Sequence, residues 1–463
     1  MIKASIFFWD RTRAALLRYA PTERQRVFAF TIVAGAICGL TAVAYHLCIQ
    51  FAEHRMIDRA FAAPNHSWMF WVIATPALGG LVAGIFLTYV VPGAAGSGIP
   101  QVKAAYALGN DRLSTRDAIG KFFTSILQIG SGASLGREGP TVQICVGVIN
   151  KIARNLPIAP ISRHRMLPVA AAAGVAAAFN APISAIIFTV EEIVGDMDQT
   201  LLTGVVVAAA IAAAVERSIL GQHPVLHVTV SYGLQHASQL LAYGVLGVVS
   251  GGLSLVFREG LLGLRVRFKE WNTVPRWMHP AIGGAVTGAL AVVAMYWLKA
   301  GGVTGTGYEM LTAALTGGLA LKVMLGLCLL KIVATVFSYA SGGAGGIFAP
   351  SLFVGAMLGG VFGYLDQAVF RHSSESIGAF ALVGMGAMFA GFIRAPITSI
   401  LIIFEMTGNY DLILPLMISN MLSYTISHHW RPIPLYDAFL LQDGVVLHPD
   451  APQTAGSPVS AVG

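Results

Sequence analysis

The stretch Ser131-Gly-Ala-Ser-Leu-Gly-Arg-Glu-Gly-Pro140 returns in the second half of the chain as Ser341-Gly-Gly-Ala-Gly-Gly-Ile-Phe-Ala-Pro350. The offset between this and the other repeated segments drifts only from 204 to 214 residues. Five ordered matches at nearly one offset indicate that the two halves share one fold. The other four pairs are 76–84 with 280–288, 96–98 with 305–307, Lys121 with Lys331, and 181–191 with 395–405.

The composition excludes a soluble globular protein. Of 463 residues, 56% are apolar and 11% are charged, whereas soluble domains carry roughly 25% charged residues. The cysteines are isolated and lack CxxC spacing, so neither a metal knuckle nor a disulfide framework is indicated. The net charge of +7 lies in short polar segments between apolar runs. This pattern is typical of cytoplasmic loops of membrane proteins and does not indicate a nucleic-acid surface.

Long runs without charged side chains predict membrane-spanning helices. The run 27–52 contains no Asp, Glu, Lys or Arg, and at about 1.5 Å per residue it is long enough to cross a bilayer of ~30 Å. Many similar runs are interrupted by Gly or Pro, which the bilayer tolerates only where protein buries the backbone or where it lines a water-filled path. We therefore expect an all-α polytopic transporter or channel, not an enzyme. The similar runs are 60–102, 166–190, 218–257, 277–298, 332–365, 376–393 and 412–430.

The runs and the repeat predict four regions. Residues 1–26 mix apolar and basic side chains, which predicts an N-terminal amphipathic helix at the membrane surface and a cytoplasmic N-terminus. Residues 27–232 and 239–442 form the first and second membrane repeats. Residues 443–463 form a short C-terminal tail without regulatory domains. The residues alone leave open whether the repeats are parallel or inverted.

Three glycine-bearing turns end in proline and then run into apolar sequence, namely 96–100, 136–140 and 346–350. Proline suits the first helical position, so each turn predicts a helix that begins inside the membrane. Unpaired N–H groups at such helix ends bind anions without a full positive charge. The alternative is that the glycines only permit close helix packing.

Acidic residues stand next to these turns. Glu138 precedes Pro140, so its carboxylate would occupy the helix end that a permeant anion needs and would leave once protonated. This predicts one side chain that is both gate and proton carrier; the alternative is an ordinary acidic cap. Glu191 and Glu405 are related by the repeat, and we expect helix-end carboxylates neutralised by Arg or Lys. Glu192 is the added acid, for which a proton relay is the hypothesis.

Other patterns favour less specific interpretations. The segment 132–136 matches the GxSxG motif of serine hydrolases, a rival hypothesis that the repeat disfavours because its counterpart lacks the serine. His223 and His227 have metal-like spacing, but the proline between them favours a loop. His428 and His429 are interpreted as a polar edge at the membrane interface. For the repeat-related Lys121 and Lys331 we expect structural charge partners. No metal and no cofactor is predicted.

The three turns in order resemble the anion-site signatures of the CLC family of chloride channels and chloride/proton exchangers. The similarity covers about residues 27–440 and includes the segments 394–397, 405–410 and 434–436. The resemblance implies a homodimer with one pore per subunit, each built from two inverted repeats of tilted and broken helices. It also implies a prokaryotic plasma membrane protein with both termini in the cytoplasm.

The resemblance further assigns roles to single residues. Ser97 and Tyr436 would give hydroxyls to a chloride ion, and Ile347 and Phe348 would give backbone N–H groups. Glu138 would be the external gating glutamate. Ser97 is similar to the residue of chloride-selecting members, in place of the proline of nitrate-preferring ones.

The second acid separates two activities within that family. Glu192 matches the internal proton-transfer glutamate of exchangers, which channels commonly lack. The resemblance therefore implies a proton-coupled chloride antiporter, with chloride and protons as substrates; the alternative is a passive voltage- or pH-gated chloride channel. Gln101 and Lys103 stand where some relatives carry glutamates, so the electrostatics of the inner entrance differ from theirs.

Overall fold

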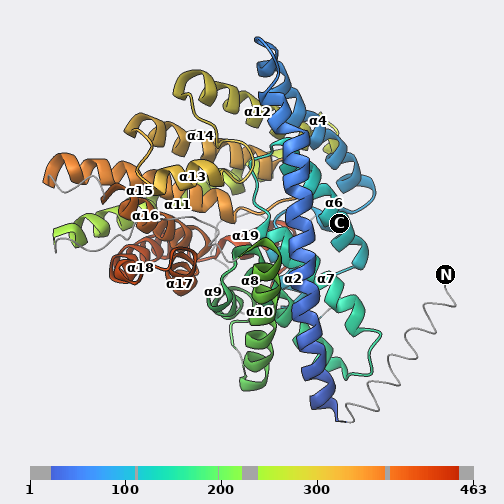
Figure 1. The fold of residues 1–463 in the computed structure, drawn as a ribbon. Coiled ribbons are helices and arrows are strands. Elements are labelled where there is room, and N and C mark those ends of the chain that lie inside the picture. Colours follow the sequence, from blue (N-terminus) through green and yellow to red (C-terminus); the bar gives the residue numbers. More distant parts are fainter. Residues whose placement is uncertain (1–21, 110–112, 197, 222–237, 371–375, 448–463) are drawn as a thin grey trace.

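The computed structural model describes residues 22–109, 113–196, 198–221, 238–370 and 376–447. Over these residues the chain is helical, and its only extended pairing is an isolated bridge between Gly136 and Gly346. The predicted all-α polytopic fold is confirmed (Figure 1). The α-helices are α2 (Glu23–Arg55), α3 (Ile57–Phe61), α4 (Ser67–Tyr89), α5 (Ile99–Ala107), α6 (Thr115–Ser131), α7 (Glu138–Ala153), α8 (Pro160–Phe179), α9 (Pro182–Phe188), α10 (Gln199–Leu220), α11 (Ser238–Glu270), α12 (His279–Val293), α13 (Tyr308–Leu315), α14 (Leu321–Ala340), α15 (Phe348–Phe370), α16 (Ser376–Ile393), α17 (Pro396–Thr407), α18 (Ile413–Trp430) and α19 (Leu435–Gln442). The short 3-10 and π-helical turns are η1 (Pro92–Ala94), η2 (Thr189–Val194), η3 (Arg276–Met278), η4 (Ala294–Leu298) and η5 (Tyr410–Leu412).

The first described helix begins before the predicted span. Thr22 caps α2, and the Thr22 and Gln25 side chains accept hydrogen bonds reciprocally from each other's backbone N–H groups. This capping box sets the start of α2 at Glu23, so residues 23–26 belong to the membrane helix and not to a separate amphipathic segment. The rest of the predicted segment 1–26 lies outside the described residues.

The two repeats run in opposite directions through the molecule. Helices α2 and α11 are their equivalent first helices, each of 33 residues. Near its C-terminal end α2 contributes Glu53 to a cavity of about 650 Å³, the Tyr308 cavity. The corresponding end of α11 contributes Arg265 to a second cavity of about 760 Å³, the Gln101 cavity. Thr88 at the end of α4 and His279 at the start of the equivalent helix α12 both line the Gln101 cavity. One helix therefore ends where its equivalent begins, so equivalent helices are antiparallel and the repeats are inverted.

Reciprocal contacts identify the pseudo-two-fold axis between the repeats. A Cβ atom on Gly80 would lie 2.2 Å from the carbonyl oxygen of Pro280, and one on Gly284 would lie 2.1 Å from that of Pro76. Glycine is therefore what allows α4 and α12 to touch backbone to backbone, as small residues do in membrane bundles. Figure 1 shows α12 beside α4 despite their separation in sequence. The repeats read from the sequence thus pack against each other through equivalent residues.

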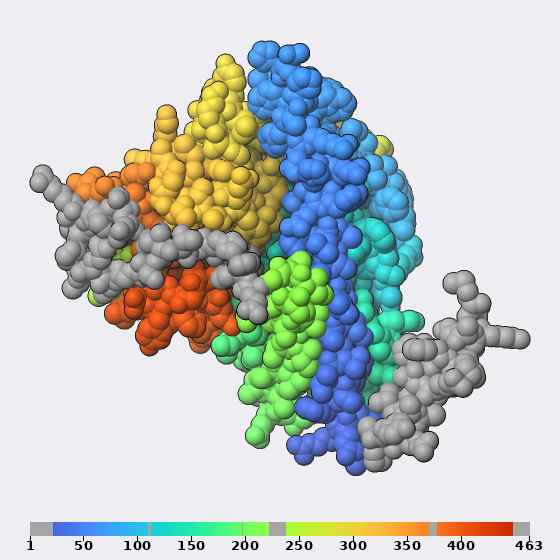
Figure 2. Space-filling view, viewed as in Figure 1, coloured from blue at the N-terminus to red at the C-terminus, as the bar shows by residue number. Residues whose placement is uncertain are grey.

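The molecule is apolar inside and outside, as a membrane protein requires. Within the described residues seven helices are long and apolar enough to cross a membrane. Large apolar side chains such as Phe51, Phe70 and Trp297 are exposed, which suits contact with lipid. Figure 2 shows α2 and α10 side by side along one face. The N-terminal ends of α7 and α15 are completely buried, so the functional site lies in the interior.

Candidate anion and proton site

Three helix N-termini meet at the centre of the molecule. Gly136 and Gly346 exchange both backbone hydrogen bonds at 2.7 Å, which joins the turn before α7 to the turn before α15. A Cβ atom on Gly139 would lie 2.4 Å from the Ser97 carbonyl oxygen, so the turn before α5 touches the first turn of α7. The unpaired N–H groups of all three helices, and the positive ends of α7 and α15, therefore face one region.

The prolines of these turns were predicted as first helical residues, and that prediction is wrong by one or two positions. Pro100 is the second residue of α5, whereas Pro140 and Pro350 are the third residues of α7 and α15. Every N–H of a first helical turn lacks an intrahelical partner, so a proline costs no hydrogen bond at any of these positions. The predicted consequence, a helix beginning inside the membrane, is unchanged.

The four residues assigned to the anion come together at this meeting point. Ser97 and Tyr436 are fully buried, and both hydroxyl oxygens lack a hydrogen-bond partner within the described structure. Ser97 lies near the Tyr436 hydroxyl, and the Tyr436 ring centroid lies 6.4 Å from that of Phe348. Ile347 and Phe348 are buried at the start of α15. Buried hydroxyls without a partner are costly unless a ligand satisfies them, and a chloride ion accepts such donors.

Glu138 is the first residue of α7 and is 1% exposed. Its Oε1 accepts a hydrogen bond of 2.8 Å from Tyr308 Oη, and its Oε2 has no partner within the described structure. A Cβ atom on Gly136 would lie 2.3 Å from Oε2, so the carboxylate folds back over the turn that precedes its own helix. Tyr308 and Arg137 both line the Tyr308 cavity, which places the carboxylate between this cavity and the buried hydroxyls.

Glu192 lies in the π-helical turn η2 that follows α9. Its side chain is 3% exposed, and its Oε1 lies 2.9 Å from Lys103 Nζ. Lys103 Nζ also lies 2.6 Å from Oδ1 of Asp437, the residue after Tyr436. Lys103 therefore contacts both the buried Glu192 and Asp437. Gln101 closes the α5 turn by accepting from Gly98 N and donating to the Ala95 carbonyl oxygen.

Glu191 and Glu405 bind helix N-termini instead of cations. Glu405 accepts hydrogen bonds from the N–H groups of Ile183 and Ser184 and from the Ser184 hydroxyl. Glu191 accepts the equivalent bonds from the N–H groups of Ile397 and Thr398 and from the Thr398 hydroxyl. The prediction of Arg or Lys partners is wrong, because each carboxylate caps the helix of the other repeat and the positive helix end supplies the neutralising charge.

Lys121 and Lys331 have structural contacts, as expected, but their hydrogen bonds are to carbonyl groups. Lys121 Nζ donates to the Gly96 carbonyl oxygen at 2.6 Å. Lys331 Nζ donates to the carbonyl oxygens of Gly302, Val303 and Gly305 at 2.7–3.1 Å. Each lysine thus fixes the glycine turn of its own repeat.

The serine-hydrolase hypothesis fails on geometry. The hydroxyl of Ser134, the serine of the GxSxG match, is buried and lies 2.9 Å from Thr335 Oγ1. Its N–H donates to Ser338 Oγ. These contacts attach the turn to α14 and give the hydroxyl no imidazole base. His428 and His429 are exposed at the end of α18, as predicted for an interfacial edge, whereas His223 and His227 lie outside the described residues.

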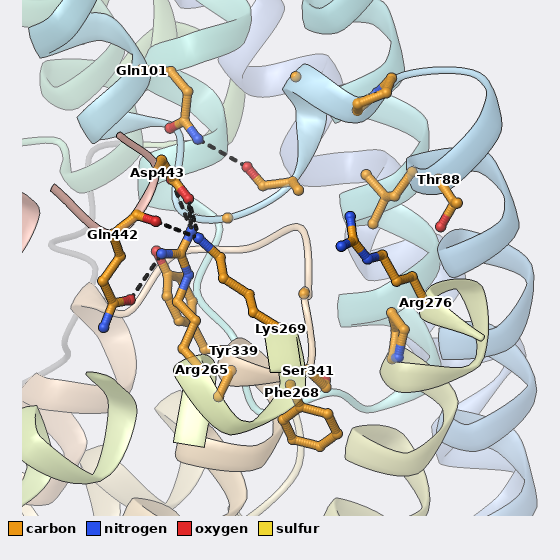
Figure 3. A pocket seen from close by; sticks show the side chains of 18 of the residues that line it. Thr88, Gln101, Arg265, Phe268, Lys269, Arg276, Tyr339, Ser341, Gln442 and Asp443 are labelled. Atoms are coloured by element: carbon orange, nitrogen blue, oxygen red, sulfur yellow. Dashed lines mark hydrogen bonds and ion pairs between the residues drawn. The ribbon is translucent and has the colours of Figure 1, made fainter. Parts of the chain in front are cut away.

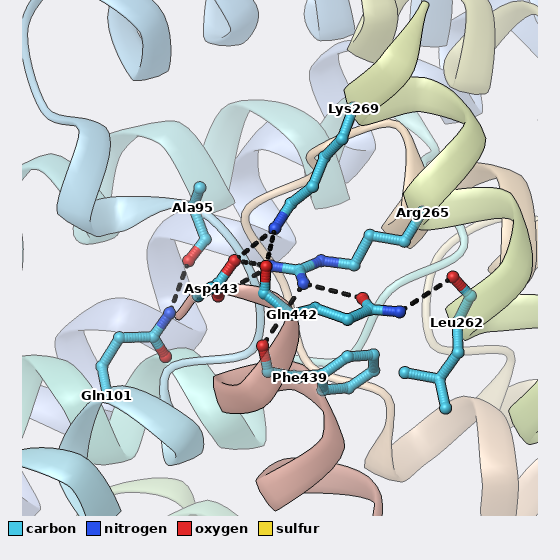
Figure 4. A network of polar contacts seen from close by, with 8 residues as sticks. All are labelled: Ala95, Gln101, Leu262, Arg265, Lys269, Phe439, Gln442 and Asp443. Carbon is cyan, nitrogen blue, oxygen red and sulfur yellow. Dashed lines mark hydrogen bonds and ion pairs between the residues drawn. The ribbon is translucent and has the colours of Figure 1, made fainter. Parts of the chain in front are cut away.

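The Gln101 cavity reaches Gly96, the residue before Ser97, from the side opposite the Tyr308 cavity. Its lining includes Gly96 and Tyr339 beside Ser97, and it carries basic side chains from α11, η3 and α12 (Figure 3). Arg265 Nη2 contacts both carboxylate oxygens of Asp443 at 2.8 Å, and Lys269 Nζ lies 2.6 Å from Asp443 Oδ1 (Figure 4). These contacts fix the C-terminal end of α19 to α11.

Comparison with known proteins agrees with this geometry. The sequence profile of voltage gated chloride channels matches residues 79–428, more than half of the chain. The chain belongs to this family.

Relatives within the voltage gated chloride channel family extend over almost the whole chain. The H(+)/Cl(−) exchange transporter ClcA of Cronobacter sakazakii is 32% identical over 442 residues, covering 92% of each chain. The protein of the same name from Salmonella arizonae is 30% identical over 437 residues, covering 93% of this chain and 90% of the relative. Both relatives are named as transporters.

Solved structures share the fold. The crystal structure of a slow cyanobacterial Cl⁻/H⁺ antiporter superposes with a TM-score of 0.82 at 22% identity, covering 90% of this chain and 97% of that one. A CLC-type fluoride/proton antiporter superposes with a TM-score of 0.72 at 21% identity, covering 89% and 97%. At these identities the comparison concerns the fold, which is the same inverted-repeat architecture.

The sequence analysis did not predict several contacts at the site. Tyr308, the partner of Glu138, follows the glycine turn that matches 96–98, and that position was the one available signal. Asp437 directly follows Tyr436 but lacks a motif of its own. The clamp of Arg265 and Lys269 on Asp443 joins residues far apart in sequence, so no local pattern could reveal it.

Proposed function

We propose that this protein exchanges chloride for protons across a membrane. One observation carries the proposal: two buried carboxylates lie near the Ser97 and Tyr436 hydroxyls, which have no partner in the described structure, with Glu138 beside the Tyr308 cavity and Glu192 joined through Lys103 to Asp437, the residue after Tyr436. Buried acids in a membrane protein are expensive and mark ion or proton pathways. The names of the ClcA relatives support the same activity.

In this proposal Glu138 alternates between two roles. As a carboxylate it occupies the N-terminal end of α7, where a chloride ion would otherwise bind, because both are attracted by the positive helix end. Once protonated it loses this attraction and turns toward the Tyr308 cavity, which leaves the position to chloride. Tyr308, which donates to Oε1, holds the ionised state. Ser97 and Tyr436 give hydroxyls, and Ile347 and Phe348 give N–H groups, to the central anion.

The orientation in the membrane follows from the basic loops. Glu23 at the start of α2 contacts Ala159 and Ser162 at the start of α8, beside Arg163 and Arg165. The Gln101 cavity carries Arg265, Lys269 and Arg276. Cytoplasmic loops carry the excess of Lys and Arg, so we assign this side to the cytoplasm and the Tyr308 cavity to the outside. Both ends of the described chain then face the cytoplasm.

The proposal extends to assembly and location. One chain contains both cavities and every donor of the anion site, so each copy of a homodimer would carry its own pore. The family resemblance supports this dimer and a prokaryotic plasma membrane. Cross-linking of the protein in native membranes, followed by denaturing electrophoresis, tests the dimer: a band at twice the chain mass is expected, and a monomer band alone contradicts it.

Transport is tested in reconstituted vesicles. Vesicles loaded with high chloride are diluted into low chloride, and a chloride electrode and a glass electrode follow the outer solution together. We expect chloride efflux to drive protons inward, even against an imposed proton gradient. Chloride efflux without proton movement would contradict exchange and would make the protein a passive channel.

A further inference from the structure

Lys103 connects the proposed proton site with the proposed anion site. It belongs to α5, the helix that begins just after Ser97. Its ammonium group lies 2.9 Å from Glu192 Oε1 in η2 and 2.6 Å from Asp437 Oδ1 in α19. Asp437 directly follows Tyr436, whose hydroxyl is buried without a partner. Three separate elements thus meet at one cation.

The charges of this trio are unbalanced. One ammonium group faces two carboxylates, so the ionised trio carries one excess negative charge, which the uptake of a single proton removes. The side-chain exposure is 3% for Glu192, 14% for Lys103 and 27% for Asp437. Burial disfavours an ionised carboxyl group, so the proton goes to Glu192, while Asp437 keeps contact with water.

The remaining charged groups near Glu192 have other partners. Arg394 donates to the carbonyl oxygens of Pro432 and Ser427, and Glu191 accepts from the first turn of α17. Arg394, Glu191 and Tyr436 interact with Glu192 only electrostatically, without a hydrogen bond to its carboxyl group. Lys103 is therefore the cation in direct contact with Glu192 in the described structure.

Helix α19 is held at its far end. Arg265 donates to the Phe439 carbonyl oxygen and to the Gln442 side chain, Lys269 donates to the Gln442 carbonyl oxygen, and both contact Asp443 (Figure 4). The helix has eight residues and is about 12 Å long. With its C-terminal end clamped, a change in the ion pair between Lys103 and Asp437 acts on the N-terminal end of α19, where Tyr436 lies.

We propose that Lys103 is a positioning residue that links the protonation of Glu192 to the placement of the Tyr436 hydroxyl, acting through Asp437. While Glu192 is ionised, Lys103 is shared between two carboxylates. After Glu192 takes a proton from the cytoplasmic side, Lys103 pairs with Asp437 alone, and the first turn of α19 follows. The inference rests on the proposed function, because it assigns Glu192 to the proton path and Tyr436 to the anion.

The linkage is tested by chloride binding as a function of pH, measured by titration calorimetry on the purified full-length protein carrying Glu138→Gln, in which the gate no longer titrates. Coupling between two sites typically changes an affinity by roughly 5–150-fold. We expect the chloride affinity of the Glu138→Gln protein to vary about fivefold or more across the titration of Glu192. Lys103→Gln and Asp437→Asn remove most of this variation, and Lys103→Arg retains it. An unchanged pH dependence in Lys103→Gln, or the same loss in Lys103→Arg, would overturn the proposal.

A double variant separates linkage from simple loss of structure. In the Glu138→Gln protein, Glu192→Gln removes the pH dependence that remains, so adding Lys103→Gln as well leaves the same pH profile if Lys103 acts through the acid. Additive effects would contradict the proposal. The matched control is Asp443→Asn, which loosens the other end of α19. It is expected to alter chloride affinity equally at every pH, and a selective loss of pH dependence there would overturn the assignment to Lys103.

Failure of this inference can be told apart from failure of the proposed function. Chloride binding is measured without a gradient, so it reports the linkage even in a protein that moves chloride alone. Vesicles of the unchanged protein report exchange separately. Coupled transport together with pH-dependent binding that Lys103→Gln leaves intact would reject the linkage and retain the exchanger.

Discussion

The two inverted repeats share a backbone and differ in chemistry at the same turn. Gly136 and Gly346 pair across the pseudo-two-fold axis, and the residues that follow them are Arg137 and Glu138 in the first repeat but Ile347 and Phe348 in the second. The shared backbone supplies buried helix N-termini from both sides. In the proposed function, the titratable carboxylate in only one repeat gives the pore an outer gate, and the apolar pair in the other leaves its N–H groups available to an anion.

A second pair of equivalent residues, Glu191 and Glu405, shows the same difference between symmetric and asymmetric positions. Glu191 and Glu405 cap each other's repeat with the same set of hydrogen bonds, so they belong to the symmetric scaffold. The next residue is Glu192 in the first repeat and the buried Met406 in the second. Symmetric acids therefore maintain the fold, and the acids without a counterpart are the ones that we assign to proton movement.

The largest expected effect comes from removing the asymmetric gate. Glu138→Gln mimics the protonated side chain permanently, so it can neither compete with chloride as an anion nor carry a proton. We expect proton flux in vesicles to fall to background while chloride flux continues and loses its pH dependence. Glu309→Gln is the control, because Glu309 is exposed in the same cavity and should retain coupling. Proton pumping by Glu138→Gln would contradict its role.

Removing the second asymmetric acid affects one flux only. Glu192→Gln leaves the helix N-termini and Glu138 intact, so chloride movement and its dependence on outer pH persist. Proton flux is lost, because the path from the cytoplasm has no acceptor. Simultaneous chloride and pH recordings compare it with Glu270→Gln, an exposed acid at the end of α11. Preserved proton flux in Glu192→Gln would reduce this residue to a structural acid.

The helical scaffold could be predicted from the sequence because each repeat contains short motifs that can be recognised locally. Glycine turns, prolines and apolar runs predicted buried helix ends, and the matched segments predicted two related halves. The residues alone left the direction of the repeats open, and the family resemblance predicted the inversion; the structure reveals it through the cavities that equivalent helices such as α2 and α11 reach. The site residues came from motifs, whereas Tyr308 and Asp437 are partners brought in by folding. The carbonyl partners of Lys331 and the helix caps at Glu191 and Glu405 likewise depend on tertiary contacts.

The symmetric acids should have equal energetic effects. Glu191→Gln and Glu405→Gln each replace charge-assisted hydrogen bonds, which are worth about 1.5–3 kcal/mol. We expect both variants to lower the thermal unfolding midpoint in detergent by similar amounts. Differential scanning fluorimetry measures this, with the exposed Glu309 and Glu270 variants as references. A loss in only one variant would show that the two caps are not equivalent.

The smallest expected effect comes from removing the hydrogen bond that Tyr308 donates to Glu138. Tyr308→Phe removes one hydrogen bond to Glu138, and such a bond contributes about 0.5–1.5 kcal/mol, or roughly two- to tenfold. We expect chloride flux at neutral pH to increase within this range, because the carboxylate leaves its position more readily. Tyr364→Phe is the matched control, since its hydroxyl donates to the Leu319 carbonyl oxygen away from Glu138. A decreased flux in Tyr308→Phe alone would contradict the holding role.

The central claim is that the helix N-termini and the unpaired hydroxyls form the anion site, and that Glu138 competes for part of it. Crystals of Glu138→Gln grown in bromide test it directly by anomalous diffraction. The account predicts one bromide peak within contact of Ser97 Oγ, Tyr436 Oη and the N–H groups of Ile347 and Phe348. It also predicts a second peak where the Glu138 carboxylate lies in the unchanged protein. Bromide bound elsewhere in the pore, with neither position occupied, would contradict the account.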